Sequence, residues 1–328
     1  MRVLVTGGAG YIGSHVAKAL ARAGHQPIVV DNLSMGHRWA VRWGPLIEAD
    51  LADRARLCEL LKGVDAVIHL AASAYVGESV RDPGKYYRNN FANSIHLLDA
   101  MVANHVQQIV FSSTAAVYGE PEQVPIPETE KRRPINPYGE SKFYVEEALA
   151  AYARAHGLRW LSLRYFNAAG ADLGGEIGEM HSPETHLIPL AIYAALKLRP
   201  HIEIYGDDYP TPDGTAVRDY IHVDDLAEGH VRGLEYLQEG GQSAAMNLGV
   251  GRGYSVRSVI DVVQRISGAP VCVKQAPRRP GDPAELVAAP DKAKRLLHWQ
   301  PRHSDLETIV TSAVRWHRQA LESGLHRD

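Results

Sequence analysis

The sequence predicts a protein of the α/β class, with a doubly wound parallel sheet in a large lobe and a smaller C-terminal lobe. Short β-branched runs alternate with longer amphipathic runs from the first residues onward, which is typical of a parallel sheet with helical crossovers. The run Ala-Val-Ile-His-Leu-Ala at residues 66–71 lacks polar alternation, as expected of a strand covered by helices on both faces. A chain of 328 residues, 45% of them hydrophobic, has enough apolar material for two lobes around a cleft.

The first half of the chain supplies most of the predicted sheet. Strands are expected at residues 2–6, 27–31, 46–50, 66–71, 108–113 and 159–165, and helices at residues 12–23 and 54–61. A long helix is expected over residues 138–156. Asn136 suits its N-cap, Pro137 suits its first position, and Gly157 suits its C-terminal end.

Glycine and proline concentrate in the twenty or so residues after Asn167, and this change predicts the boundary between the lobes. We therefore expect a large lobe at residues 1–167 and a smaller, substrate-binding lobe at residues 168–328. A helix is expected at residues 187–198 and a strand at residues 202–205. The segment 219–250 again has the pattern of a strand and helix of the large sheet, so the chain is expected to return there.

Composition argues against several classes of function. Lys and Arg total 35 against 38 for Asp and Glu, so the chain has no basic excess with which to bind nucleic acid. Cys58 and Cys272 form neither a disulfide framework nor a zinc cluster, which favours a reducing, cytoplasmic location. No apolar run approaches the roughly 20 residues of a membrane span, so no membrane association is expected.

A glycine-rich turn, Thr6 to Gly13, lies between the first expected strand and the first expected helix. Gly7, Gly10 and Gly13 let the backbone approach a pyrophosphate, which the free N–H groups at the start of the helix then bind. Asp31 ends the second strand, where its carboxylate accepts both ribose hydroxyls and repels a 2′-phosphate. The pattern predicts a Rossmann-type dinucleotide site that prefers NAD to NADP.

A second group of residues has the pattern of a proton-transfer site. Tyr138 and Lys142 lie four positions apart, on one face of the expected helix. Ser113 and Thr114 place hydroxyls at the C-terminal end of a strand, the edge at which open parallel sheets bind ligands. A tyrosine base near neutral pH needs its pKa lowered by roughly 2–3 units, which the Lys142 ammonium and the positive nicotinamide of NAD⁺ together supply.

Several segments resemble the extended short-chain dehydrogenase/reductase family, and within it the nucleotide-sugar 4-epimerases, over nearly the whole chain. The matching segments are residues 6–15, 76–79, 112–119, 138–142, 163–167, 208–211 and 213–222. The resemblance implies that bound NAD⁺ takes a hydride from C4 of UDP-glucose or UDP-galactose while Tyr138 removes the 4-hydroxyl proton. The 4-keto sugar then turns in the cleft, and the hydride returns to its opposite face. Thr114 hydrogen-bonds the sugar oxygen, and Lys142 holds the nicotinamide ribose and the tyrosine.

The resemblance also implies the members of the binding sites. The cofactor site would comprise Gly7, Gly10, Tyr11, Ile12, Gly13, Asp31, Asn32, Asp50, Leu51, Leu70, Ala71, Asn89, Tyr138, Lys142 and Phe166. The substrate site would comprise Thr114, Asn167, Leu187, Arg218, Arg279 and Asp282. The planar guanidinium of arginine suits the diphosphate because it matches two oxygens at once. Family members pair long helices such as those expected at residues 90–104 and 138–156, which implies a homodimer.

The sequence leaves the identity of the sugar open. Ala74 stands where many galactose-type members have Lys, and Leu286 stands where some members have a Tyr that crowds the sugar. Ala168-Ala169 replaces a bulkier pair, and Thr185-His186 replaces an Asn pair that contacts the substrate in several relatives. UDP-arabinose/UDP-xylose and UDP-N-acetylhexosamine 4-epimerases therefore remain alternatives. A 4,6-dehydratase is disfavoured, because alanines follow Thr114 where those enzymes have Asp-Glu. A non-catalytic NAD-sensing protein is disfavoured, because its Tyr–Lys pair is often lost.

One histidine-containing loop invites a metal interpretation. His181, Glu184 and His186 lie close together in the sequence, but their spacing matches no established metal site, and glycine and proline surround them. From the sequence we expect no metal.

Overall fold

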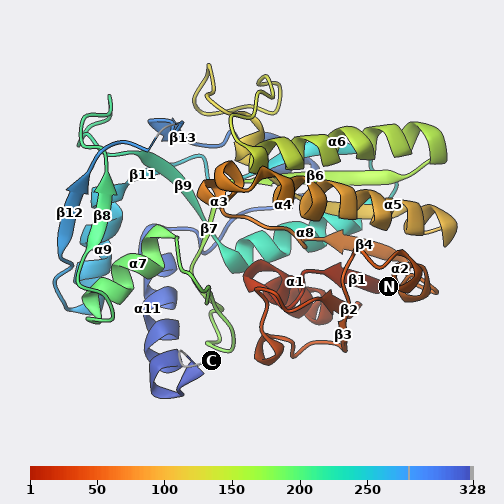
Figure 1. Cartoon of the computed structure of the whole chain (residues 1–328), viewed down its shortest axis with the longest axis horizontal. Coiled ribbons are helices and arrows are strands. Elements are labelled where there is room, and N and C mark those ends of the chain that lie inside the picture. The colour runs from red at the N-terminus through yellow and green to blue at the C-terminus, as the bar shows by residue number, and fades with distance from the viewer. Residues whose placement is uncertain (280, 326–328) are drawn as a thin grey trace.

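The computed structural model describes residues 1–279 and 281–325. Within these residues a seven-stranded sheet has the strand order β10-β6-β5-β4-β1-β2-β3, and every pair in it is parallel (Figure 1). Its strands are β1 (Arg2–Thr6), β2 (Gln26–Asp31), β3 (Leu46–Glu48), β4 (Ala66–His69), β5 (Gln108–Thr114), β6 (Arg159–Tyr165) and β10 (Ala244–Leu248). The strand order reverses between β1 and β4, as in doubly wound sheets that bind ligands at that point. The predicted fold class is confirmed.

Helices cover both faces of the large sheet. Val3 and Val5 of β1 pack toward α1 (Tyr11–Arg22) and α8 (Val223–Gln238). Leu4 packs toward the other face, because successive strand residues point in opposite directions. The second face is covered by α2 (Arg54–Leu60), α5 (Asn93–Ala103) and α6 (Pro137–His156). Shorter helical segments are η1 (Arg38–Ala40), α3 (Val76–Arg81), α4 (Pro83–Tyr86), η2 (Tyr87–Ala92), η3 (Ala115–Val117) and α10 (Asp291–Leu296).

The helix α6 begins and ends where the sequence predicts. The Asn136 side chain accepts a hydrogen bond from the Gly139 N–H at 2.9 Å, and Pro137 occupies the first turn. Gly157 closes the helix in the left-handed region, with φ of 72°. These caps place Tyr138 in the first turn of the helix, facing the carboxyl end of β5.

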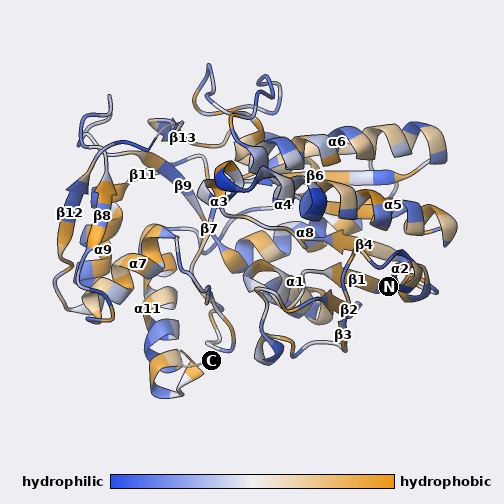
Figure 2. Cartoon of the chain, viewed as in Figure 1, coloured by the Kyte–Doolittle hydropathy of each residue, from blue (hydrophilic) through white to orange (hydrophobic). Residues whose placement is uncertain are grey.

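The smaller lobe lies beside the carboxyl ends of the large sheet (Figure 1). Its strands are β7 (Asn167–Ala169), β8 (Ile202–Tyr205), β9 (Val217–His222), β11 (Gly253–Ser255), β12 (Val273–Ala276) and β13 (Glu285–Leu286). Its helices are α7 (Leu187–Ala195), α9 (Val256–Ser267) and α11 (Leu306–Glu322). Figure 2 shows hydrophobic residues along α7 and β8, which join α9 and α11 in a separate core.

The chain crosses between the lobes differently from the sequence prediction. The strand β9 pairs with β7, β11 and β13 in the smaller lobe, not with the large sheet. The reason is that β7 follows β6 directly and offers a parallel partner, with Asn167 opposite Tyr220. The helix α8 and the strand β10 do return to the large lobe. We propose that the cofactor lobe comprises residues 1–167 together with α8 and β10.

Within the described part of the chain, no helix combines the length and the apolar character needed to cross a membrane.

His230 is a buried histidine of α8, the helix that packs on one face of the large sheet. Its side chain is inaccessible to solvent, and its Nδ1 donates to the Leu226 carbonyl oxygen at 2.9 Å. Burial lowers the pKa of His230 to about 4, although that hydrogen bond opposes the shift. Below the ordinary histidine pKa of about 6.5, the unfolded chain therefore binds a proton that the folded chain does not.

The contribution of His230 to the stability of the folded protein should consequently fall as the pH drops from about 6.5 toward 4. We expect His230→Leu, which removes the titrating group, to abolish roughly 2 kcal/mol of the loss in unfolding free energy between pH 7.5 and 4.5. Urea unfolding of both proteins across this range measures the difference. Parallel stability curves for wild type and variant would contradict the prediction.

Candidate active site

The glycine turn leaves no room for a side chain at Gly7 or Gly13. Gly7 has a φ of 71°, and its N–H donates to the Val30 carbonyl oxygen at 2.8 Å. A Cβ on Gly13 would lie 2.1 Å from the Gly7 carbonyl oxygen. Gly10 precedes α1, and no side chain of the described residues caps that helix. The free N–H groups and the positive end of the helix dipole therefore suit an anion such as a pyrophosphate.

The carboxyl ends of β2 and β3 bring together three predicted cofactor residues. Asp31 accepts hydrogen bonds from the Ala9 N–H at 3.0 Å and from the Leu33 N–H at 2.9 Å. Burial raises the pKa of Asp31, and these two backbone donors oppose the shift. Asn32 Nδ2 donates to Asp50 Oδ2 at 2.8 Å. The arrangement gives the turn a carboxylate that accepts backbone hydrogen bonds and retains lone pairs for hydroxyl donors.

The remaining predicted cofactor residues play several structural parts. A Cβ on Gly7 would lie 2.6 Å from the Ala71 nitrogen, so the segment that follows β4 contacts the turn directly. The Tyr11 hydroxyl donates to the Gly170 carbonyl oxygen at 2.7 Å, which links α1 to the smaller lobe. Asn89 Nδ2 donates to Ser73 Oγ at 3.1 Å. Side chains of the others pack in the core or against it; these are Ile12, Leu51, Leu70 and Phe166.

Tyr138 lies against the end of β5, where Thr114 is located. A hydrogen bond links the two side chains, and Thr114 Oγ1 also accepts from the Ala116 N–H at 3.1 Å. The Tyr138 ring packs edge-on against Tyr86, with ring centroids 6.4 Å apart. Burial raises the pKa of Tyr138, while the Thr114 hydrogen bond opposes the rise. The chain's own residues thus keep Tyr138 a protonated phenol. The lowered pKa expected from the sequence also depends on the positive nicotinamide of NAD⁺.

Lys142 lies one turn further along α6, in an apolar setting. Its Nζ donates to the Ser112 carbonyl oxygen at 2.8 Å and lies 4.9 Å from the centroid of the Phe111 ring. Burial lowers the pKa of Lys142 to about 7. The ammonium is therefore held at the end of β5, with its charge dependent on pH near neutrality.

Ser113 does not share the site of its neighbour Thr114. Its hydroxyl is fully buried and donates to Glu146 Oε1 at 2.6 Å. Glu146 also forms an ion pair with Arg164 at 2.6 Å. Because successive strand residues point to opposite faces, Ser113 supports the packing of α6 on the sheet while Thr114 faces the phenol. We therefore remove Ser113 from the proposed catalytic group.

Sequence reasoning missed the buried pair of Glu146 and Arg164. Burial lowers the pKa of Arg164, but the adjacent Glu146 carboxylate raises it by more, so the net shift is upward. The signal was present, because Glu146 follows Lys142 by four residues and lies on the same face of α6. The pair holds α6 against β6 and so helps to set the position of Tyr138, on the same helix, relative to the end of β5.

Apart from Thr114 at the end of β5, the predicted substrate residues lie in the smaller lobe and at the crossover. Arg218 of β9 forms an ion pair with Asp282, and its Nη1 donates to the Val217 carbonyl oxygen at 2.7 Å. The Arg279 guanidinium stacks 3.8 Å from the centroid of the Tyr205 ring. Two further predicted residues occupy element ends: Asn167 begins β7 and Leu187 begins α7. The structure thus brings Arg218 and Asp282 together and gives Arg279 a separate aromatic support.

The fold and this site together define a dinucleotide-binding protein of the doubly wound class, with a tyrosine, lysine and threonine at the sheet edge. The family of NAD-dependent epimerases and dehydratases matches residues 3–249. The chain belongs to this NAD-dependent epimerase/dehydratase family, and the predicted resemblance is confirmed.

Individual relatives match nearly the whole chain. A UDP-glucose 4-epimerase from Rhizobium meliloti is 51% identical over 98% of this chain and 98% of the relative. The crystal structure of UDP-glucose 4-epimerase from Brucella ovis in complex with NAD is 53% identical, with a TM-score of 0.94 over 96% of this chain and 98% of that chain. A Stenotrophomonas maltophila UDP-glucose-4-epimerase with bound NAD and formylated UDP-arabinopyranose is 40% identical, with a TM-score of 0.95 over 98% and 99% of the two chains.

Proposed function

We propose that this chain is an NAD-dependent UDP-glucose 4-epimerase, an isomerase that interconverts UDP-glucose and UDP-galactose by inverting C4. The observation that carries the proposal is the hydrogen-bonded pair of Tyr138 and Thr114, with Lys142 one helical turn away, at the ligand-binding edge of the sheet. Relatives of about half identity over the full length are UDP-glucose 4-epimerases.

The residues of the turn fit a dinucleotide. The N–H groups at the start of α1 hold the pyrophosphate. Glycine at positions 7 and 13 lets the turn pack against its own backbone and against residues 70–71, which keeps these N–H groups in place. Asp31 accepts the ribose hydroxyls through its remaining lone pairs. NAD⁺, when bound there, supplies the acceptor and then the donor of the hydride at C4.

The protein's own residues manage the proton. Thr114 orients the sugar hydroxyl toward Tyr138, which accepts its proton on oxidation and returns it on reduction. Because burial alone raises the pKa of Tyr138, the phenolate needs nearby positive charge from Lys142 and the oxidised nicotinamide. In the smaller lobe, Arg218 and Arg279 hold the diphosphate of the nucleotide, and Asp282 accepts hydrogen bonds from its ribose. Asn167 and Leu187 lie beside the nucleotide. Because these residues bind only the nucleotide, the hexose stays free to rotate between the two hydride transfers.

Incubation of the purified protein with single UDP-sugars tests this function. UDP-galactose, without added NAD, should convert to UDP-glucose, with the product identified by chromatography. Conversion of UDP-xylose or UDP-N-acetylgalactosamine but not UDP-galactose would replace the hexose assignment by one of the two alternatives. A protein that releases NAD on denaturation but converts no UDP-sugar would overturn the enzymatic proposal.

The pentose alternative has one specific observation in its favour. The Stenotrophomonas maltophila relative was crystallised with a formylated UDP-arabinopyranose. The N-acetylhexosamine alternative is supported by Leu286, which packs with Phe166 against a small apolar cluster. Leucine is smaller than the tyrosine that crowds the sugar in some family members. Incubation with single UDP-sugars decides among the hexose, pentose and N-acetylhexosamine substrates.

Asp31 should set the choice between NAD and NADP. Asp31→Asn keeps the shape of the side chain but removes the charge that repels a 2′-phosphate, so the preference for NADH over NADPH should fall roughly 10- to 100-fold. Fluorescence titration of each reduced cofactor measures this ratio. Asp65→Asn, which removes an exposed carboxylate at the opposite end of the sheet, is the matched control and should leave the ratio unchanged. An unchanged ratio in Asp31→Asn would remove Asp31 from this role.

The remaining expectations concern assembly and location. We propose a cytoplasmic homodimer in which α5 and α6 of two subunits pair. An aromatic group on this surface supports the pairing: Tyr144 is 41% exposed and packs beside Tyr87, Phe91 and Phe143.

A further inference from the structure

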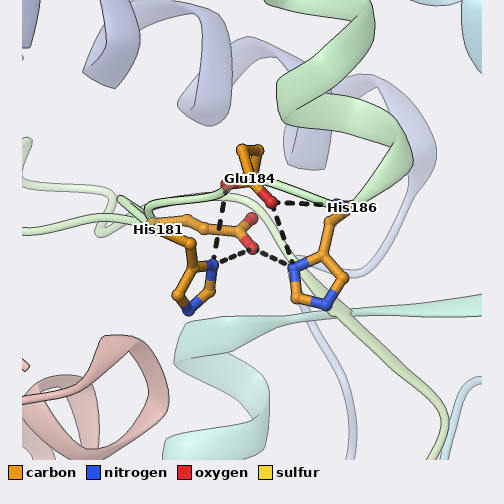
Figure 3. A group of neighbouring side chains, drawn as sticks. His181, Glu184 and His186 are labelled. Carbon is orange, nitrogen blue, oxygen red and sulfur yellow. Dashed lines mark hydrogen bonds and ion pairs between the residues drawn. The ribbon is translucent and has the colours of Figure 1, made fainter. Parts of the chain in front are cut away.

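Four side chains from residues 179–186 converge immediately before α7, and the sequence did not predict their meeting. Glu179 joins His181, Glu184 and His186, and one ligand atom from each lies within 4.8 Å of all the others. Figure 3 shows His181 and His186 turned toward Glu184 from opposite sides. We propose that these four residues bind a divalent transition-metal ion of the zinc type, separately from the proposed nucleotide-sugar chemistry.

The spacing of the donor atoms suits a tetrahedral ion. His181 Nδ1 lies 3.2 Å from Glu179 Oε1 and 3.6 Å from Glu184 Oε2. His186 Nδ1 lies 3.6 Å from Glu184 Oε1 and hydrogen-bonds Glu179 Oε1. Zinc bonds of about 2.0–2.1 Å in a tetrahedron put neighbouring donor atoms about 3.3–3.4 Å apart. Small side-chain rotations therefore bring the four donors to bonding distance.

Two atoms of the cluster lack the hydrogen bonds that burial demands. The Glu184 side chain is only 4% exposed. Its Oε1 accepts from the Thr185 and His186 N–H groups at 2.7 and 2.8 Å. Its Oε2 has no hydrogen-bond partner among the described residues, and neither has His181 Nδ1, which faces it. These two atoms face each other only as an ion pair at 3.6 Å, which is longer than a hydrogen bond. A cation between them would give each atom a bond of normal length.

The donor set selects the class of ion. Two imidazole nitrogens disfavour Mg²⁺ and Ca²⁺, which take oxygen ligands. Four donors including two histidines favour Zn²⁺, and two carboxylates neutralise its charge. Neither cysteine is available, because Cys58 and Cys272 lie in α2 and before β12, outside the cluster.

The surrounding structure holds the loop in this shape. Trp316 of α11 donates to the Glu179 carbonyl oxygen at 3.0 Å. Tyr75 donates from its hydroxyl to the Pro183 carbonyl oxygen at 3.0 Å. The ring of Tyr11, at the start of α1, packs edge-on to His181 with centroids 6.2 Å apart. An ion bound here would brace the loop between the glycine turn and the start of α7, so its expected effect is on stability.

Metal content and thermal stability test the site on the intact protein, produced without a polyhistidine tag. After dialysis against a chelator, the protein should take up about one equivalent of Zn²⁺ against a competing colorimetric chelator, and its Tm should rise by several degrees. Co²⁺ in place of Zn²⁺ should give the visible absorption of a four-coordinate ion. Wild-type protein that takes up no stoichiometric Zn²⁺ and shows no rise in Tm overturns the proposal.

Variants separate this site from the other histidines of the chain. Glu184→Gln and His181→Asn should each lose the stoichiometric Zn²⁺ and the rise in Tm, while the Tm of the metal-free proteins stays near that of metal-free wild type. His298→Asn, at an exposed position away from the cluster, should keep both properties. Retention of one equivalent by both cluster variants, or its loss in His298→Asn, would also overturn the assignment.

Discussion

Tyr138→Phe should reduce the rate of UDP-galactose epimerisation by roughly 10²- to 10⁴-fold, the usual contribution of a positioned acid or base. The substitution removes one hydroxyl, which hydrogen-bonds Thr114, and keeps the ring that packs against Tyr86. The fold and the bound NAD should therefore survive. Initial rates, together with the NAD released on denaturation, distinguish loss of proton transfer from loss of cofactor.

A second tyrosine of the same helix provides the control. Tyr144 lies on α6 as well, but it is 41% exposed and contacts other aromatic rings. Tyr144→Phe keeps the ring that the proposed dimer contact uses and removes only a hydroxyl, so it should keep the wild-type rate within about twofold. If Tyr138→Phe turned over as fast as Tyr144→Phe, the proton would have to be transferred elsewhere, and the proposed mechanism would be wrong.

Gly13→Ala should weaken NAD binding by roughly 10- to 100-fold, because forcing an extra methyl group into a packed site costs about 1–3 kcal/mol. The added Cβ would lie 2.1 Å from the Gly7 carbonyl oxygen and 2.7 Å from the Gly8 Cα. Both neighbours are backbone atoms of the turn itself, so relief of the clash must move the N–H groups that face the pyrophosphate. Equilibrium titration with NADH and the NAD content of the purified protein measure the effect.

The control for this substitution is a glycine whose surroundings can yield. A Cβ on Gly84 of α4 would meet only the guanidinium end of the flexible Arg88 side chain. Gly84→Ala should bind NADH as wild type does, and its stability should be equal or slightly higher, because alanine favours the helix. Normal NADH affinity in Gly13→Ala would show that the turn does not hold the pyrophosphate.

Much of the candidate site was predictable because its determinants are local. The glycine spacing, the Asn136 cap, Pro137 and Gly157 each act within one or two turns of chain, so their effect on the backbone can be inferred from neighbouring residues alone. The four-residue step from Tyr138 to Lys142 likewise fixes their shared face once the helix is known.

Contacts between distant segments were not predictable in the same way. The strand β9 was expected in the large sheet, but its pairing depends on β7, about fifty residues earlier in the chain. Ser113 and Thr114 are both hydroxyl residues at one strand end, and only the packing of α6 shows which of them meets Tyr138 and which meets Glu146.

The sequence by itself determined the class of fold, the dinucleotide turn and the pair on α6, since short-range sterics and helical periodicity specify all three. The tertiary structure alone decided the crossing of the chain into the smaller lobe, the pairing of Arg218 with Asp282, and the meeting of Glu179 with His181, Glu184 and His186. These features depend on where loops and strands pack against partners far away in the chain. The spacing of residues along the chain does not reveal these contacts, because the conformation of a loop depends on the distant segments that pack against it.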